Sequence, residues 1–296
     1  MSTEAAQTPA MAQGAVFDEE AGGAYDPKLY TPGEIALPVR SVEDAASPES
    51  RAHFAEHGWV SVRSVLSADE VAAAKASIDD LVGRRVPGFT GLMLERSSMA
   101  DYDALSPDEK FDCVRKLWDF CPHDERMAGI AFGRNIGTVL QNLFGGRPTR
   151  MFQDMALLKP PGRGREKPWH QDHAFFDFPL GTQVVGVWIA IDPATVENGC
   201  MQLLDGGHKD GPRNHFRRRD WQICDNEMMG RKSVAFPLGP GDALFFDGLI
   251  PHGTPANTTR ERRRALQFHY CSTTAEAAEK DFRLSIFGGE GRGATC

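Results

Sequence analysis

The chain is 296 residues long, with 41% hydrophobic and 25% charged residues, which is typical of a globular protein with one large core or two small ones. The net charge is −8, but residues 1–48 carry eight acidic and two basic side chains, so the remainder is nearly neutral and no nucleic-acid partner is expected. No apolar run is long enough to span a membrane, and six scattered cysteines without a C-x-x-C pair predict reduced thiols in a cytoplasmic protein.

The first segment, residues 1–48, is predicted to lie outside the folded domain. Up to about residue 24 it is rich in Ala, Gly, Gln and acidic residues without periodicity, which indicates disorder. Residues 25–48 contain four prolines and are expected to run over the core as an extended arm. A single domain is therefore expected over residues 49–296.

The first part of this domain, residues 49–146, predicts a helical flank. Ser67 and Glu70 form a capping box, and the apolar residues that follow recur at helical spacing until Gly83. Residues 84–106 show no regular pattern, so we expect a long loop that is a candidate lid. Residues 107–144 predict two or three further helices.

From residue 147 to residue 275 the pattern changes to short apolar runs separated by glycine and proline. Runs of this length with turn signals between them indicate strands of a sandwich or barrel. The remaining residues, 276–296, are expected to form a C-terminal tail. The predicted strands are Met151–Leu158, Val184–Ile191, Val234–Phe236, Ala243–Phe246 and Ala265–Tyr270.

The tripeptide His170-Gln171-Asp172 is followed, 82 residues after its histidine, by His252. Two imidazoles and one carboxylate form the facial triad that binds Fe(II) and leaves the opposite positions open. On an extended strand, residues two apart point to the same side. We therefore expect His170 and Asp172 to converge on one ion, with Gln171 directed away and His252 contributed by a distant strand.

Arg263 lies eleven residues after His252, in the middle of a run of three arginines. Strand alternation places Arg263 on the same face as Ala265, Gln267 and His269. A guanidinium binds a carboxylate through two parallel hydrogen bonds, so an inward Arg263 would suit a dicarboxylate. Solvated positions are expected for Arg262 and Arg264, and His269 is expected to be a satisfied buried histidine.

With these motifs the chain resembles the phytanoyl-CoA dioxygenase family of Fe(II)- and 2-oxoglutarate-dependent oxygenases, which includes the ectoine hydroxylases. The resemblance implies a mainly β fold with flanking helices around a double-stranded β-helix, or jelly-roll, core. The segments that carry it are Phe54–Val60, Leu66–Val71, Lys167–His173, Glu197–Gln202, Gly206–Lys209 and Pro251–Ala265.

The resemblance also implies roles for individual residues. His170, Asp172 and His252 would be the iron ligands, and Arg263 would bind the distal carboxylate of 2-oxoglutarate. Other residues would surround the co-substrate (Thr254, Gln153 and Trp188) or the substrate (His173, Phe175 and Phe176). A position in the hydrophobic core is the alternative for Trp188 and for the two phenylalanines. Met155 and Phe176 stand where ectoine hydroxylases have arginine and tryptophan, so ectoine is not the expected substrate.

The implied reaction is oxidation of a small molecule, most simply hydroxylation, with O2 consumed and succinate and CO2 released. Desaturation and epoxidation remain open, whereas the intact Asp172 argues against halogenation. A role in secondary metabolism is expected, in a monomer or homodimer. The alternatives are a jelly-roll metalloenzyme that does not use 2-oxoglutarate, a non-catalytic binding protein on the same scaffold, and an acyl-CoA hydroxylase. In an acyl-CoA hydroxylase, the phosphates of CoA could be bound by a basic cluster, which otherwise would be a solvated loop. This cluster consists of Arg213, Arg217, Arg218 and Arg219.

Overall fold

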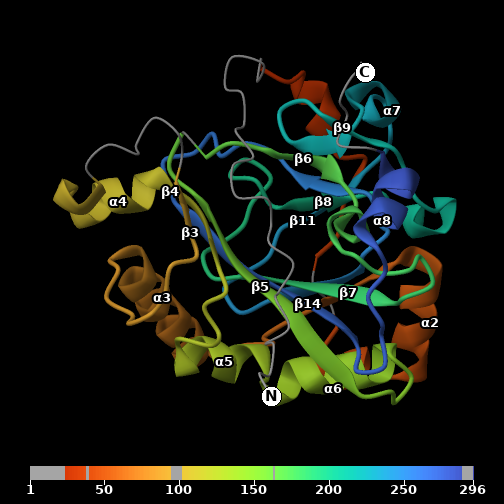
Figure 1. Ribbon diagram of the computed structural model, residues 1–296, viewed down its shortest axis with the longest axis horizontal. Coiled ribbons are helices and arrows are strands. Elements are labelled where there is room, and N and C mark those ends of the chain that lie inside the picture. The colour runs from red at the N-terminus through yellow and green to blue at the C-terminus, as the bar shows by residue number, and fades with distance from the viewer. Residues whose placement is uncertain (1–23, 38–39, 95–101, 163, 289–295) are drawn as a thin grey trace, which may run out of the picture.

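Two β-sheets face each other in the computed structural model, and most of the longer helices cover the outer face of the larger sheet (Figure 1). The structure describes residues 24–37, 40–94, 102–162, 164–288 and 296. The larger sheet has seven strands in the order β2 (Trp59–Val62), β12 (Ala243–Asp247), β7 (Val184–Ala190), β14 (Arg263–Ser272), β5 (Thr149–Lys159), β4 (Val114–Trp118) and β3 (Leu92–Leu94).

The smaller sheet has five strands and lies over one face of the larger sheet. Neighbouring strands of this sheet are antiparallel, except that β1 (Glu34–Ile35) runs parallel to β11 (Val234–Phe236). A separate antiparallel hairpin, β9 (His215–Arg217) and β10 (Trp221–Ile223), lies beside it. The order of the smaller sheet is β1 (Glu34–Ile35), β11 (Val234–Phe236), β8 (Met201–Leu203), β13 (His252–Thr254) and β6 (Lys167–His170).

Alternation along the central strands divides the core into two layers. In β14, Leu266, Phe268 and Tyr270 pack against the helices, whereas Ala265 faces the smaller sheet. β7 alternates in the same way, with Val187 towards the helices and Trp188 between the sheets. Since successive side chains of a strand point to opposite faces, one strand can serve a helix-covered core and a second core between the sheets.

Five of the eight helices in the described residues begin at a residue whose side chain caps the first turn. Ser67 and Glu70 form the predicted capping box at the start of α3, and Gly58 ends α2 with φ 80°, a left-handed conformation that glycine adopts without strain. The helices are α1 (Val42–Ala45), α2 (Pro48–His57), α3 (Ala68–Val82), α4 (Pro107–Cys113), α5 (Glu125–Ala131), α6 (Arg134–Leu143), α7 (Asp225–Met228) and α8 (Lys280–Phe287), with 3-10 turns η1 (Pro27–Tyr30), η3 (Tyr102–Ala104), η4 (Asp172–Phe175) and η5 (Gly207–Asp210).

The predicted fold class is confirmed, since the chain is sheet-rich with flanking helices and all five predicted strands are present within a few residues of their expected bounds. β2 lies between α2 and α3, where the family resemblance implies a strand after the opening helix. The flank differs from the prediction in β3 and β4, which further extend the larger sheet. β3 lies inside the expected loop 84–106, of which residues 95–101 fall outside the described part of the chain. The tail also contains a helix, α8, which contacts η4.

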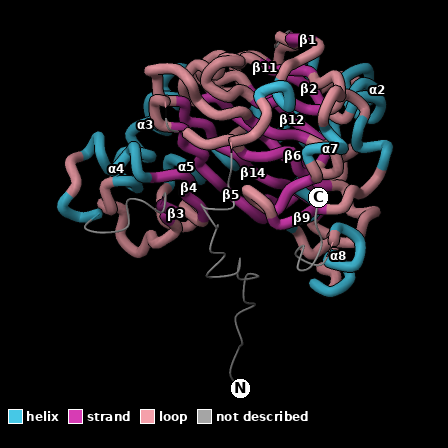
Figure 2. The backbone as a smooth tube through the Cα atoms, turned by 90° about the horizontal axis from the view of Figure 1, so that it is seen from above, coloured by secondary structure: helices cyan, strands magenta, loops and turns pink. Residues whose placement is uncertain are grey.

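The N-terminal arm from residue 24 is built into the fold. β1 pairs with β11, and the ring of Tyr30 stacks on Trp169 with centroids 5.7 Å apart. Trp169 donates a hydrogen bond from Nε1 to the Leu29 carbonyl, and Gln202 donates from Nε2 to the Tyr30 carbonyl. The predicted disorder before residue 24 concerns residues outside the described ranges. Figure 2 shows the sheets from above, with β1 at one edge.

Candidate active site

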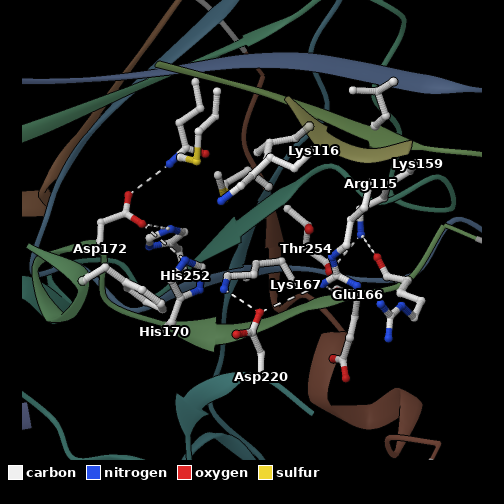
Figure 3. A pocket seen from close by; sticks show the side chains of 18 of the residues that line it. Arg115, Lys116, Lys159, Glu166, Lys167, His170, Asp172, Asp220, His252 and Thr254 are labelled. Carbon is white, nitrogen blue, oxygen red and sulfur yellow. Dashed lines mark hydrogen bonds and ion pairs between the residues drawn. The ribbon is translucent and has the colours of Figure 1, made fainter. Parts of the chain in front are cut away.

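His170, Asp172 and His252 form a buried cluster whose ligand atoms all lie within 4.8 Å of one another. His252 Nε2 lies 3.5 Å and His170 Nε2 3.3 Å from Asp172 Oδ1, and β13 and β6 are paired so that the two histidines face each other in register. Two imidazole nitrogens and one carboxylate oxygen at these separations fit the donor set of a facial Fe(II) site. The three side chains converge at one end of the cavity in Figure 3.

Both histidines are held in the tautomer that a metal requires. Each donates a hydrogen bond from Nδ1 to the backbone carbonyl two residues earlier, His170 to Pro168 at 2.8 Å and His252 to Ile250 at 3.0 Å. The proton is therefore on Nδ1, and Nε2 presents its lone pair to the cluster. Burial lowers the pKa of His170 to about 4, so its imidazole is neutral near pH 7.

The turn between His170 and Asp172 differs from the expected continuous strand. β6 ends at His170, and Asp172 begins the 3-10 turn η4. The side chains of His170 and Asp172 still converge, because Gln171 between them keeps an extended backbone. The side chain of Gln171 is directed away from the cluster, as expected. Gln171 donates to the carbonyls of Gly211 and Leu249 and accepts a hydrogen bond from the Arg213 amide.

Arg263 lies at the start of β14 and lines the cavity that contains the triad. Its side chain is buried, at 1% exposure, and its guanidinium lies 5.4 Å from the Trp188 ring centroid. The one hydrogen bond that it makes within the described residues runs from a terminal nitrogen to the Leu157 carbonyl at 3.3 Å, and its Nε has no partner there. Burial lowers the pKa of Arg263 to about 10. A buried guanidinium without a carboxylate is suited to an anionic ligand.

The neighbouring arginines do not point into the cavity, but they are not simply solvated. Arg262 pairs with Asp112 at 3.0 Å, and Arg264 pairs with Asp192 at 2.7 Å. Both side chains keep part of their surface in solvent, as expected, and the ion pairs with acidic side chains of neighbouring elements are what the sequence did not predict. It is the middle arginine of the run that faces the triad.

Four of the other expected site residues also line the cavity: Thr254, Gln153, Phe175 and Phe176. Two residues do not. Trp188 is fully buried between the sheets and supports Arg263 from behind, so it is not part of the cavity wall. His173 turns away, donates a hydrogen bond to the Pro179 carbonyl and packs against Phe287 of α8.

The cavity also contains charged residues that the sequence did not single out (Figure 3). Lys116, on β4, makes no hydrogen bond or ion pair with the part of the chain that the structure describes, and its ring contact is with Trp118. Its pKa is lowered to about 8 by burial and by the neighbouring Lys167. Lys116 was missed because its strand follows directly after a helix and lies far from the metal motifs in sequence.

Other charged residues of the cavity have partners within the protein. Lys167 lies 2.6 Å from Asp220, and Glu166 binds Arg219 and accepts a hydrogen bond from Tyr30 of the arm. The ammonium of Lys159 donates to backbone carbonyls, including that of Thr254 at 3.2 Å. The two carboxylates of this group, Asp220 and Glu166, are both paired with cations other than Arg263.

A family model for phytanoyl-CoA dioxygenase (PhyH) matches residues 54–265. The chain belongs to the phytanoyl-CoA dioxygenase family. The expected cofactors of this dioxygenase family are Fe(II), 2-oxoglutarate and O2, and the His-Asp-His cluster supplies the ligand set for the metal.

Individual relatives agree with this assignment. Peroxisomal phytanoyl-CoA dioxygenase of Rattus norvegicus is 28% identical over 264 residues, covering 85% of this chain and 75% of that protein. The fold matches EctD from S. alaskensis, with a TM-score of 0.65, 21% identity and coverage of 88% and 87% of the two chains. It also matches the epimerase SnoN in complex with Fe3+, alpha ketoglutarate and nogalamycin RO, with a TM-score of 0.62, 22% identity and coverage of 80% and 90%.

Within the described ranges, no helix is both long enough and apolar enough to cross a bilayer.

Proposed function

We propose that this protein is an Fe(II)- and 2-oxoglutarate-dependent dioxygenase that hydroxylates a small molecule of secondary metabolism. The observation that carries the proposal is one cavity lined by both the His170–Asp172–His252 cluster and a buried Arg263 that has no acidic partner among the described residues. The first group fits a metal ion and the second fits the distal carboxylate of 2-oxoglutarate.

In this proposal each residue of the cavity has a definite task. His170, Asp172 and His252 hold the iron, and Arg263 with Thr254 binds the distal carboxylate. Lys116 also lines the cavity and makes no hydrogen bond or ion pair with the described residues, and we assign it to the same dianionic co-substrate. When bound, the iron supplies the O2 chemistry that couples decarboxylation of 2-oxoglutarate to attack on a C–H bond. The chain contributes orientation and a buried setting that keeps the oxidant from side reactions.

Phe175 and Phe176 are proposed to contact the substrate, because they line the cavity beside the triad. The ring of Phe175 lies 5.6 Å from that of His170. Gln153 and Met155, which lie opposite them on β5, would complete this wall. His173 and Trp188 are not proposed to touch substrate or co-substrate, because neither lines the cavity.

A secondary metabolite fits the cavity surroundings better than an acyl-CoA. The basic cluster considered for a CoA tail is largely neutralised: Arg213 pairs with Asp210, and Arg219 pairs with Asp225 and Glu166. Arg218 also lies 3.8 Å from Asp225. SnoN, a structural relative, was crystallised with nogalamycin RO, which supports a natural-product substrate. The family name supports the acyl-CoA alternative, so both classes belong in a substrate screen.

The decisive experiment measures succinate formation from 2-oxoglutarate with a panel of candidate substrates. Asp172→Ala and His252→Ala are expected to abolish substrate-stimulated turnover, because each removes a ligand. Glu276→Gln, an exposed change outside the cavity, serves as the control and should keep full activity. Full turnover by either ligand variant would refute the assignment.

A jelly-roll metalloenzyme that does not use 2-oxoglutarate is the competing function. Anaerobic titration of the Fe(II) protein with 2-oxoglutarate separates the two, since chelation of the metal by the 2-oxoacid gives a visible charge-transfer band. Absence of the band in a protein that binds Fe(II) would favour the competing function. Product analysis by mass spectrometry then distinguishes hydroxylation from desaturation and epoxidation.

The cytoplasm is the proposed compartment, because all six cysteines are free thiols. The rat relative is described as peroxisomal, so cell fractionation is the appropriate test. For the oligomeric state we propose a monomer or homodimer, which light scattering after size-exclusion chromatography would measure.

A further inference from the structure

The two carboxylate oxygens of Asp172 have different surroundings. Oδ1 faces the ligand nitrogens, 3.3 Å from His170 Nε2 and 3.5 Å from His252 Nε2. Oδ2 points away from these nitrogens and is hydrogen-bonded by two side chains of β14, with His269 Nε2 at 2.7 Å and Gln267 Nε2 at 3.1 Å. All of these groups are buried. One oxygen is thus presented to the metal site, and the other is held by the protein.

Both β14 groups act as donors to Oδ2. The Nδ1 atom of His269 is buried without a hydrogen-bond partner among the described residues, so the imidazole carries its proton on Nε2, where a carboxylate accepts it. Gln267 can donate only through its amide nitrogen, because its carbonyl oxygen would repel Asp172. The 3.1 Å separation between Gln267 Nε2 and His269 Nε2 follows from two donors converging on one oxygen.

The backbone explains why these two side chains meet Asp172. Gln267 and His269 lie two apart on the face of β14 that looks towards the smaller sheet. The register with β5 shifts directly after His269, where Phe152 is the extra residue on β5. The rings of Phe152 and Phe176 lie 6.0 and 4.9 Å from the imidazole and fix its orientation. Bulges beside active sites commonly re-aim side chains in this way.

We propose that His269 and Gln267 are positioning residues that hold Asp172 as a ligand through one oxygen only. The inference rests on the proposed function for the identity of the ion, but its geometry belongs to the chain alone. A bound ion held by three protein ligands would keep its other positions open for exogenous ligands. Occupation of both Asp172 oxygens would remove one of these positions, and the two hydrogen bonds to Oδ2 prevent it.

The test measures metal affinity in the absence of 2-oxoglutarate and O2. Anaerobic Fe(II) binding would be followed by equilibrium dialysis for wild type, His269→Leu, His269→Gln and Gln267→Met. Loss of a group that orients a metal ligand weakens binding by about 10- to 100-fold. We expect this loss for His269→Leu and Gln267→Met. Recovery to within a few-fold of wild type is expected for His269→Gln, which restores a donor.

Cys271→Ala is the matched control, since Cys271 is equally buried on β14 and packs near Phe176 without a hydrogen bond to Asp172. It should bind Fe(II) like wild type. Circular dichroism confirms that each variant is folded, and Gln267→Met carries the test if His269→Leu does not fold. Wild-type affinity in the folded Leu and Met variants, an equal loss in His269→Gln, or an equal loss in Cys271→Ala would each overturn the inference.

The outcomes separate this inference from the proposed function. A wild-type protein that binds Fe(II) but never consumes 2-oxoglutarate would refute the function and leave the support of Asp172 intact. Unchanged Fe(II) affinity in the folded variants, with normal turnover by wild type, would refute the inference alone. A wild-type protein that does not bind Fe(II) would refute both.

Discussion

Replacement of Arg263 by leucine should weaken the binding of 2-oxoglutarate without lowering the stability of the ligand-free protein. In the proposed complex the guanidinium makes two charge-assisted hydrogen bonds to a carboxylate, each contributing about 1.5–3 kcal/mol. Loss of both, with partial compensation by water, should cost about 3–4 kcal/mol, which raises the KM for 2-oxoglutarate roughly 100- to 1000-fold. The residue is 1% exposed, so bulk solvent offers little screening of this interaction.

The same substitution should leave the ligand-free protein as stable as wild type or more so. Arg263 is a buried cation without an acidic partner among the described residues, and burial lowers its pKa to about 10, which means that the charged form is disfavoured there. Leucine removes this desolvation cost and forfeits one hydrogen bond to the Leu157 carbonyl, worth about 1 kcal/mol. Urea denaturation of the apo-protein measures the difference.

The assay compares 2-oxoglutarate with 2-oxopentanoate, which has the same chain length but lacks the distal carboxylate. Wild type should strongly prefer 2-oxoglutarate, and Arg263→Leu should lose most of that preference. Arg264→Leu is the control: it breaks the pair with Asp192 and should lower stability without changing the preference. An unchanged KM for 2-oxoglutarate in Arg263→Leu, or an equal loss with both oxoacids, would refute the reasoning.

Three further substitutions follow from the charges and contacts of the site. Lys116→Met should raise the KM for 2-oxoglutarate. In wild type, kcat/KM should fall above about pH 8, because burial lowers the pKa of Lys116 to about 8 and the neutral amine no longer attracts an anion. A kcat/KM that does not change with pH in this range would contradict the assignment. Burial lowers the pKa of His215 to about 3, below the value of about 6.5 in the unfolded chain. Because the folded state binds this proton less readily, the free energy of unfolding should fall as the pH drops from about 6.5 towards 3, by at most about 1.4 kcal/mol per pH unit. Urea denaturation of His215→Gln should show a weaker pH dependence than that of wild type. Tyr30→Phe removes the 2.8 Å hydrogen bond to the buried Glu166 and should lower the unfolding free energy by about 1–3 kcal/mol in the same assay, with the exposed Glu276→Gln as reference.

Strand alternation predicted a large part of this cavity correctly. The pattern from Arg263 to His269 placed Arg263 and Gln267 inward and Leu266 outward, and the structure agrees because the strand lies between two different layers of the fold. The ligand cluster was also predictable, since its three residue types and their spacing are unusual together. The fold class followed from the spacing of apolar runs.

Other features depend on tertiary contacts that the local sequence does not encode. The strand predicted through Asp172 ends at His170, because Gln171 is anchored by loops about 40 and 78 residues away. For Trp188 the sequence left open a position beside the co-substrate or in the core, and the structure places it in the core because the smaller sheet covers its face. His269 was expected to be a satisfied buried residue, yet one ring nitrogen is unpartnered and the other contacts Asp172.

The contacts of the N-terminal arm impose an order on folding. Residues 24–36 leave the ribosome before their partners, which are Trp169, Gln202 and the strand that begins at Val234. At roughly 5–20 residues per second, synthesis of these partners takes about 10–40 s longer. During that time the arm has no sheet to join, and the backbone behind His170 lacks one of its supports. Completion of the metal site is therefore a late event in the biosynthesis of this chain, and an early-made segment contributes to it.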